Sequence, residues 1–225
     1  MKYPFLRMFK SSKEKPISLK GELLCREYIE YNKICEEKHT KEMMETTLIK
    51  GCDVLKEIGV KYWLGKGTLL GFHRENDFLS TDLDIDVDIY TDKDVYKIIK
   101  SMPFDVLFVT SNNNNYMQLA FLDKETNVIF DIYFWYLSND KIINRCCYGY
   151  FWLPFDKIDN LSHITYNGKN YPAPNPDWYC EFWYGENWKT PVKYEKGWHE
   201  YYKNECKGLI YTGTKNIRYL KYFNE

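Results

Sequence analysis

The 225-residue chain lacks an excess of charge of either sign, because its 31 Lys and Arg residues are matched by 32 Asp and Glu residues. A net charge of −1 gives it no general electrostatic attraction to nucleic acid or to an anionic membrane. No apolar run approaches the roughly 18 residues of a transmembrane helix. The basic N-terminus also lacks a signal-peptide core, since Arg7 interrupts its apolar residues. We therefore predict a cytoplasmic protein that binds no nucleic acid, with a basic start that would allow only peripheral membrane contact.

Closely spaced metal-binding thiols and imidazoles are also missing. The seven cysteines include no Cys-x-x-Cys pair, which excludes zinc-ribbon and dithiol redox spacing. The four histidines have no partner at ligand spacing, and we expect a surface role for His73. An EF-hand loop starting at Asp82 would need Gly and Glu where the chain has Val87 and Lys93. A dinucleotide fingerprint fails as well, because its third glycine falls one residue late.

The pattern along the chain predicts a basic arm over residues 1–18 and a single domain over residues 19–225. Helical periodicity runs from Leu19 to about Ile58, with a break near His39-Thr40 and a capping Gly59 after it. Further elements follow: strands over 60–64, 83–90, 106–110, 117–122 and 127–137, and helices over 91–102, 177–184 and 196–205. Aromatic residues make up 18% of the chain and gather in its C-terminal half, where core packing is their commonest use.

The most informative segment is residues 81–88, where Asp alternates with Leu, Ile and Val. A period of two puts Asp82, Asp84, Asp86 and Asp88 on one face of a strand, with successive carboxylates about 7 Å apart. Such a face needs solvent or a cation, because like charges repel. A solvated edge strand is one reading. The apolar opposite face instead favours a strand packed on a core, and hence a site for an oxygen-preferring cation, Mg²⁺ or Mn²⁺.

Two further features complete a chemical pattern. A glycine turn that opens a helix at Thr68 offers backbone N–H groups and a positive helix end to a phosphate. Asp131 is the lone acid of an otherwise apolar strand, and a buried Asp is costly unless it is paired or binds a metal. The alternative for Asp131 is a strand-end carboxylate that bonds a loop. Together these features favour phosphoryl transfer, which requires mainly positioning and charge neutralisation.

Three blocks of the sequence resemble the LicD/fukutin family of nucleotidyltransferase-fold phosphotransferases. They are Trp63 to Arg74 with Asp82 to Asp86, then Phe130 to Phe134, and finally Tyr171 to Pro174 with Tyr184 to Pro191. The resemblance implies an α+β fold: a polymerase-β-like mixed sheet flanked by helices, with N-terminal helices and an aromatic-rich C-terminal part. It also implies transfer of a phospho-alcohol, carrying choline, ribitol or glycerol, from a CDP-activated donor to a glycan or glycolipid acceptor, with release of CMP.

Carried over residue by residue, the resemblance assigns metal binding and catalysis to Asp84, Asp86 and Asp131. The third of these either ligates the cation or takes the proton of the acceptor hydroxyl. Asp88 matches nothing in the family pattern, and we expect it to be solvated or to support the ligands. A metal-dependent glycosyltransferase that uses a nucleotide sugar, and a catalytically silent binding relative, are the alternative functions.

Five residues are predicted to contact the substrate: Lys66, Gly67, Thr68, Arg74 and Asp82. Arg74 is suited to a donor phosphate, although it would equally serve to pair with Asp82 or another acid on the strand. The chain departs from the family pattern at Lys66, where a glycine is common, and at Leu83, where many members have a further Asp. Ser80-Thr81 replaces a Pro-Trp pair. These departures bear on the identity of the donor more than on the chemistry.

Overall fold

The computed structural model describes residues 39–192, apart from 91–94, 113–114 and 147–148, together with residues 205–211. It also gives the backbone of three short strands near the ends: β1 (Ile17–Leu19), β2 (Glu22–Leu24) and β13 (Arg218–Leu220). The predicted arm over 1–18 and the predicted helix over 196–205 lie almost wholly outside the described residues.

Five helices and ten further strands make up the rest of the described chain. The helices are α2 (Lys41–Glu57), α3 (Lys66–Arg74), α4 (Val95–Ser101), α5 (Asp156–Asp159) and α6 (Pro176–Tyr184). The strands are β3 (Tyr62–Leu64), β4 (Asp84–Tyr90), β5 (Asp105–Asn112), β6 (Asn115–Asp123), β7 (Val128–Ser138), β8 (Lys141–Cys146), β9 (Gly149–Pro154), β10 (Ser162–Tyr166), β11 (Lys169–Ala173) and β12 (Leu209–Tyr211).

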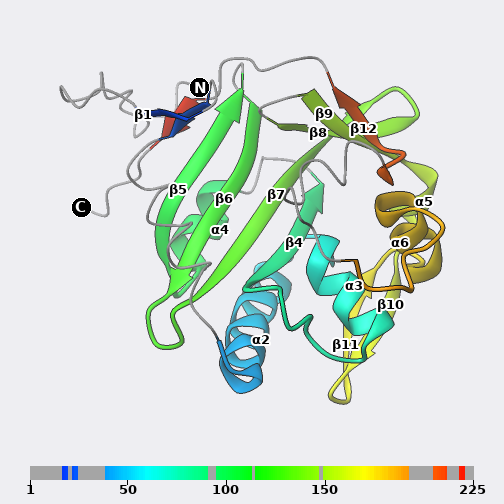
Figure 1. Ribbon diagram of the computed structural model, residues 1–225. Coiled ribbons are helices and arrows are strands. Elements are labelled where there is room, and N and C mark those ends of the chain that lie inside the picture. Colours follow the sequence, from blue (N-terminus) through cyan, green and yellow to red (C-terminus); the bar gives the residue numbers. More distant parts are fainter. Residues whose placement is uncertain are drawn as a thin grey trace.

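Nine strands form one mixed sheet in the order β12-β9-β8-β7-β6-β5-β13, with β4 paired to β7 and β3 paired to β4. The β4–β7 pairing is parallel, whereas the other pairs of this sheet are antiparallel. β7 is therefore the central strand, and it pairs with the aspartate strand β4 along seven of its eleven residues (Figure 1).

Helices cover both faces of the sheet around β7. Phe130 lies against Gly51 of α2 on one face, so closely that an added methyl at Gly51 would be 2.3 Å from the Phe130 ring. The next residue, Asp131, points to the other face because strand side chains alternate. On that second face α3 contacts β4 and α6 contacts α3 (Figure 1). The α+β mixed sheet flanked by helices is thus as predicted.

Local sequence signals explain the helix ends. Thr40 accepts the Met43 N–H and caps α2, and Asn175 accepts the Trp178 N–H and caps α6. Gly59 follows α2 with a φ of 70°, the left-handed conformation that glycine adopts without strain. The predicted start of a helix after His39-Thr40 and the glycine after that helix are confirmed, whereas the end of the expected preceding helix lies outside the described residues.

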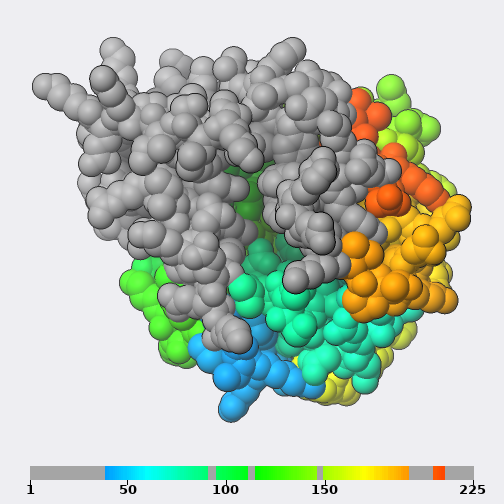
Figure 2. Space-filling model, in the orientation of Figure 1, coloured from blue at the N-terminus to red at the C-terminus, as the bar shows by residue number. Residues whose placement is uncertain are grey.

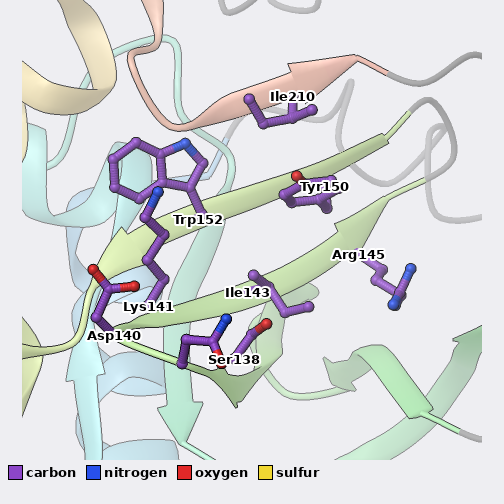
Figure 3. A pocket seen from close by; sticks show the side chains of 9 residues that line it. Ser138, Asp140, Lys141, Ile143, Arg145, Tyr150, Trp152 and Ile210 are labelled. Atoms are coloured by element: carbon purple, nitrogen blue, oxygen red, sulfur yellow. The ribbon is translucent and has the colours of Figure 1, made fainter.

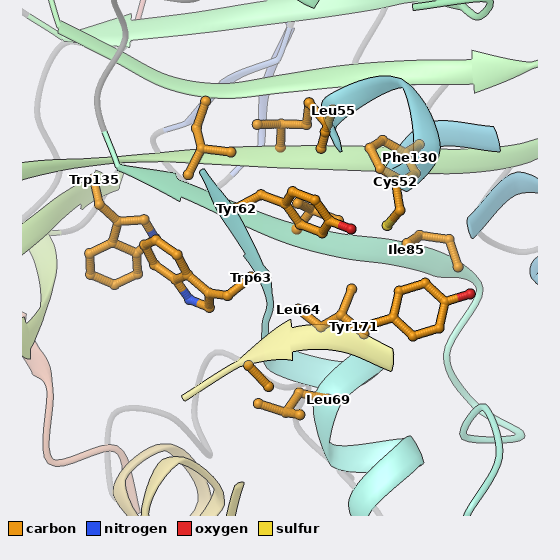
Figure 4. Packing of buried hydrophobic residues seen from close by; sticks show 14 of the residues in the cluster. Cys52, Leu55, Tyr62, Trp63, Leu64, Leu69, Ile85, Phe130, Trp135 and Tyr171 are labelled. Carbon is orange, nitrogen blue, oxygen red and sulfur yellow. The ribbon is translucent and has the colours of Figure 1, made fainter. Parts of the chain in front are cut away.

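The core lies where α2, β3, β4 and β7 meet (Figure 4). Leu55, Trp63, Leu64, Ile85 and Phe130 are each completely buried there. Burying one such side chain stabilises the fold by about 1.5–3 kcal/mol, so this cluster fixes β4 against β7 firmly.

Two predictions about secondary structure were wrong. The segment after Leu19 was expected to be helical, but Ile17–Leu19 and Glu22–Leu24 form an antiparallel hairpin. The pairing of a hairpin depends on the turn between its strands, and counting apolar residues at helical spacing does not detect such a turn. The strands β8 to β11 were not predicted either, although β10 and β11 bury alternate side chains at Ile164 and Tyr166 and at Tyr171 and Ala173. Among the described helices, none is long and apolar enough to cross a membrane.

Candidate metal and phosphate site

The register of the central strands brings two predicted carboxylates together. Asp86 of β4 is the direct parallel partner of Asp131 of β7. Both side chains are buried, at 6% and 0% exposure. The sequence positions of these residues differ by 45, and only strand pairing makes them neighbours.

Asp82, Asp84 and Asp86 form a cluster whose ligand oxygens all lie within 4.8 Å of one another. Asp84 and Asp86 begin β4, and Asp82 belongs to the loop that leads into it. One oxygen of Asp82, Oδ2, is buried without a hydrogen-bond partner among the described residues. Three converging carboxylates with such an oxygen fit a hard divalent cation of the Mg²⁺ or Mn²⁺ type. Asp82, predicted as a substrate contact, thus joins Asp84 and Asp86 as a possible ligand, while Asp131 lies beside the cluster.

The first turn of α3 faces the same carboxylates. The Gly67 N–H donates to Oδ2 of Asp86 at 3.2 Å, and the Asp86 N–H donates to the Thr68 hydroxyl at 2.9 Å. A methyl group at Gly67 would lie 2.2 Å from Oδ2 of Asp82. Position 67 therefore has to be glycine for the backbone of the helix end to approach the acidic cluster. The predicted glycine turn and helix are confirmed in their place next to the aspartate strand.

Two residues that were not predicted orient Asp131. Gln118 of β6 donates its amide to Oδ2 of Asp131 at 2.8 Å, and the Tyr133 hydroxyl donates to the same oxygen at 3.2 Å. Burial, followed by the charge of Asp131, raises the pKa of Tyr133 well above its usual value, so this phenol stays a donor. Strand alternation from Asp131 would have indicated Tyr133, whereas Gln118 depends on the β6–β7 register.

Asp88 is not solvated, which corrects one of the two readings the sequence left open. It is 0% exposed. Lys66 donates its ammonium to Oδ1 at 3.2 Å, the Trp135 indole N–H donates to the same oxygen at 2.7 Å, and the Tyr179 hydroxyl donates to Oδ2 at 3.4 Å. These donors come from three other elements, which a sequence pattern within one strand does not show.

Arg74 and His73 lie at the opposite end of α3 from the acidic cluster. Seven residues separate Arg74 from Gly67, which is about 10 Å along a helix. Arg74 donates to the Trp188 carbonyl at 3.2 Å and pairs with Glu75, so the suggested pairing with Asp82 is wrong. His73 bonds Asp177 at 3.0 Å. The contact of Arg74 with a donor phosphate stays a prediction.

The acidic cluster is electrostatically strained. Burial, together with the charges of Asp84 and Asp86, raises the pKa of Asp82 well above 3.8. Burial, and after it the charge of Asp84, likewise raises the pKa of Asp86. The positive charge of Lys66 acts in the opposite direction and lowers that pKa. A bound cation would remove this repulsion, because it favours the charged form of each carboxylate.

The raised pKa values predict how the metal-free protein responds to pH. The folded state binds protons more tightly than the unfolded chain, so this contribution to stability is largest below about pH 3.8 and is lost as pH rises through the raised pKa values. In EDTA, the free energy of unfolding should therefore fall more steeply from pH 4.5 to pH 7.5 in the wild type than in Asp84→Asn. Urea titrations across this range measure both slopes, and equal slopes would contradict the prediction.

A separate cavity of about 410 Å³ lies on β8, β9 and β12, lined by Lys141, Ile143, Arg145, Tyr150 and Trp152 among others (Figure 3). Ile143 pairs with Tyr136, which by strand alternation points to the sheet face opposite Asp131. The cavity is therefore no part of the carboxylate site.

The segment that contains the carboxylate site is visible on one face of the molecule. On the face that Figure 2 shows, residues 66–90 lie between α2 and residues 176–192.

Comparison with known proteins matches the sequence of this chain to a family. Residues 59–176, more than half of the chain, match the family described as LicD/FKTN/FKRP, nucleotidyltransferase domain. Ribitol-5-phosphate transferase FKTN of Mus musculus is 25% identical over 173 residues, and the Homo sapiens protein of that name is 23% identical over 173 residues. The match covers 69% of this chain and 34% of each relative, so the chain spans about a third of their length.

Two solved structures show weak similarity to this chain. ANT(2")-Ia in complex with adenylyl-2"-tobramycin has a TM-score of 0.42 and 12% identity, covering 73% of this chain and 87% of that one. An antigenic nucleotidyltransferase-like protein from Paracoccidioides brasiliensis has a TM-score of 0.39 and 13% identity, covering 64% and 65%. The matched residues 59–176 include α3, β4 and β7 with their carboxylates. The chain belongs to the LicD/FKTN/FKRP nucleotidyltransferase-domain family.

Proposed function

We propose that this chain is a metal-dependent transferase that moves a phospho-alcohol from a CDP-activated donor to a hydroxyl of a glycan or glycolipid and releases CMP. The observation that carries the proposal is the convergence of Asp82, Asp84 and Asp86 beside Asp131, with the Gly67 N–H on Asp86. The fukutin relatives are ribitol-5-phosphate transferases, which supports a donor of the ribitol phosphate class.

In this proposal the carboxylates of Asp84 and Asp86 hold Mg²⁺ or Mn²⁺, with Asp82 or Asp131 as a further ligand. The bound cation would supply positive charge that neutralises the pyrophosphate of the donor. The raised pKa values of Asp82 and Asp86 support this assignment, because clustered anions are stabilised by a cation.

Asp131 is the residue we assign to the acceptor hydroxyl. Its Oδ2 is held by Gln118 and Tyr133, which fixes the orientation of the carboxylate next to Asp86. A carboxylate fixed in this way takes the proton as the hydroxyl oxygen attacks phosphorus. Burial of the group keeps water from competing for that position.

The first turn of α3 is assigned to the donor phosphates. Its positive end and the N–H groups near Gly67 and Thr68 are suited to developing negative charge. Lys66 adds an ammonium at the same helix end. These groups act by position and charge, which is what phosphoryl transfer requires of a protein.

A thermal-shift panel tests the proposed function. CDP-ribitol, CDP-glycerol, CDP-choline, UDP-glucose and GDP-mannose would each be added with Mg²⁺ or Mn²⁺ and again with EDTA. A ligand at about 100 times its Kd stabilises by roughly 2.7 kcal/mol, which is about 5–10 °C for a chain of this size. We expect a metal-dependent rise with one CDP-alcohol. A rise with a nucleotide sugar alone would favour glycosyl transfer, and no rise with any ligand would favour a catalytically silent relative.

A further inference from the structure

Lys66 begins α3 in a backbone conformation that favours glycine. Its φ is 42°, in the left-handed region that side-chain-bearing residues rarely adopt. The helix cap before it, Gly65, has no side chain to accept a helix N–H. A lysine in this place therefore has to be held by contacts from elsewhere in the fold.

Asp88 supplies the main contact. The Lys66 ammonium lies 3.2 Å from Oδ1 of Asp88, and the two side chains are 11% and 0% exposed. A buried carboxylate is strongly unfavourable without a cation and hydrogen-bond donors. Lys66 thus neutralises the buried charge of Asp88, and Asp88 holds the side chain of Lys66 in place.

Tyr179 of α6 fixes both ends of this pair. Its hydroxyl accepts the backbone N–H of Lys66 at 3.0 Å and faces Oδ2 of Asp88 at 3.4 Å. Gly65 leaves room for this arrangement, because a methyl there would lie 2.1 Å from Oδ2 of Asp88. The helix end that lacks a side-chain cap is therefore capped by a residue 113 positions away.

The pair places the ammonium next to the proposed catalytic groups. Nζ of Lys66 lies 3.0 Å from the centroid of the Tyr133 ring, whose hydroxyl donates to Asp131. Its positive charge also acts on Asp86. Of the three ammonium N–H groups, one is used by Asp88 and one faces the ring, and no other acceptor for them occurs among the described residues.

We propose that Asp88 is a positioning residue, which holds the Lys66 ammonium beside Asp86 so that it binds the diphosphate of the donor. This inference rests on the proposed function for the identity of the donor. It assigns to Asp88 a task separate from metal binding, although Asp88 is two residues from Asp86 on the same strand. The backbone strain at Lys66 is then offset by the use of its charge.

A double-mutant cycle on Lys66→Gly and Asp88→Asn tests the proposal with two readouts. Glycine relieves the strain at position 66 but leaves Asp88 unpaired, so the single variant should lose roughly 10 °C in Tm. The double variant should regain more than half of that loss. Isothermal titration then measures the Kd of magnesium pyrophosphate and of CDP-ribitol, CDP-glycerol and CDP-choline. Both classes of ligand should bind the double variant at least about tenfold more weakly than wild type.

The control is Lys61→Ala, which removes an exposed lysine that donates to the Asp159 carbonyl at 2.9 Å; it should lower the Tm only slightly and leave both affinities unchanged. Independent effects of Lys66→Gly and Asp88→Asn on Tm would overturn the pairing. A double variant that regains its Tm and binds both ligand classes with wild-type affinity would overturn the positioning role. Wild-type protein that binds neither ligand class would overturn it as well. Wild-type binding of magnesium pyrophosphate without any CDP-alcohol would contradict the proposed function, while the comparison with the double variant still decides the role of Asp88.

Discussion

Replacing Asp84 with Asn is expected to raise the Tm of the metal-free protein and to abolish the rise in Tm that Mg²⁺ or Mn²⁺ produces in the wild type. The substitution removes one of three carboxylates whose oxygens lie within 4.8 Å, and it thereby relieves their repulsion. Relief of about 1–2 kcal/mol corresponds to a rise of roughly 2–8 °C. Transfer activity should fall by about a thousandfold, because a bound cation contributes several kcal/mol to phosphoryl transfer.

Thermal unfolding with EDTA and with added metal separates these effects. Asp105→Asn is the matched control, since Asp105 is a surface carboxylate that pairs with Lys124. It should leave the metal-dependent rise unchanged. A metal response that survives in Asp84→Asn, or a lower Tm in EDTA, would argue against a cation site at this cluster.

Gly67→Ala should remove metal and donor binding while the protein stays folded. The new methyl would lie 2.2 Å from Oδ2 of Asp82, which belongs to the end of a side chain and is displaced more easily than backbone. Loss of one ligand and separation of the helix end from Asp86 would weaken metal binding by about a hundredfold or more. Isothermal titration calorimetry with Mn²⁺ measures the affinity of each variant for the metal directly.

Gly51→Ala is the control, and it should lower the Tm but keep metal binding, the reverse of what is expected for Gly67→Ala. A methyl at Gly51 would meet the Phe130 ring at 2.3 Å, in the core on the far face of the sheet. Overpacking there costs about 1–3 kcal/mol, so the Tm should fall while the response to metal persists. If both alanine variants lost stability equally and both kept metal binding, the close approach at Gly67 would have no functional meaning.

The aspartate strand was predictable from the sequence because its information is local. Alternating Asp and apolar residues define β4, and the glycine turn before it defines the start of α3. Asp131 was predictable for a different reason: an acid inside an apolar strand is costly without a partner. Its placement opposite Asp86 then follows from the pairing of β4 with β7.

The surroundings of these residues were not predictable in the same way. Asp88 is bonded by Trp135 and Tyr179, which are 47 and 91 residues away. Gln118 reaches Asp131 only through the register of β6 on β7. A pattern of residue types within one segment contains no register, and register decides which side chains meet.

The closeness of β3, α3 and β4 in the sequence also has a consequence for how the site forms during folding. The helix end and most of the carboxylates are contained in residues 62–90, so they meet through short loops with a low entropic cost of closure. Asp131 joins by a non-local pairing. We therefore expect the charged cluster to assemble early, while the chain is still partly unfolded, and a cation present at that stage to assist folding as well as catalysis.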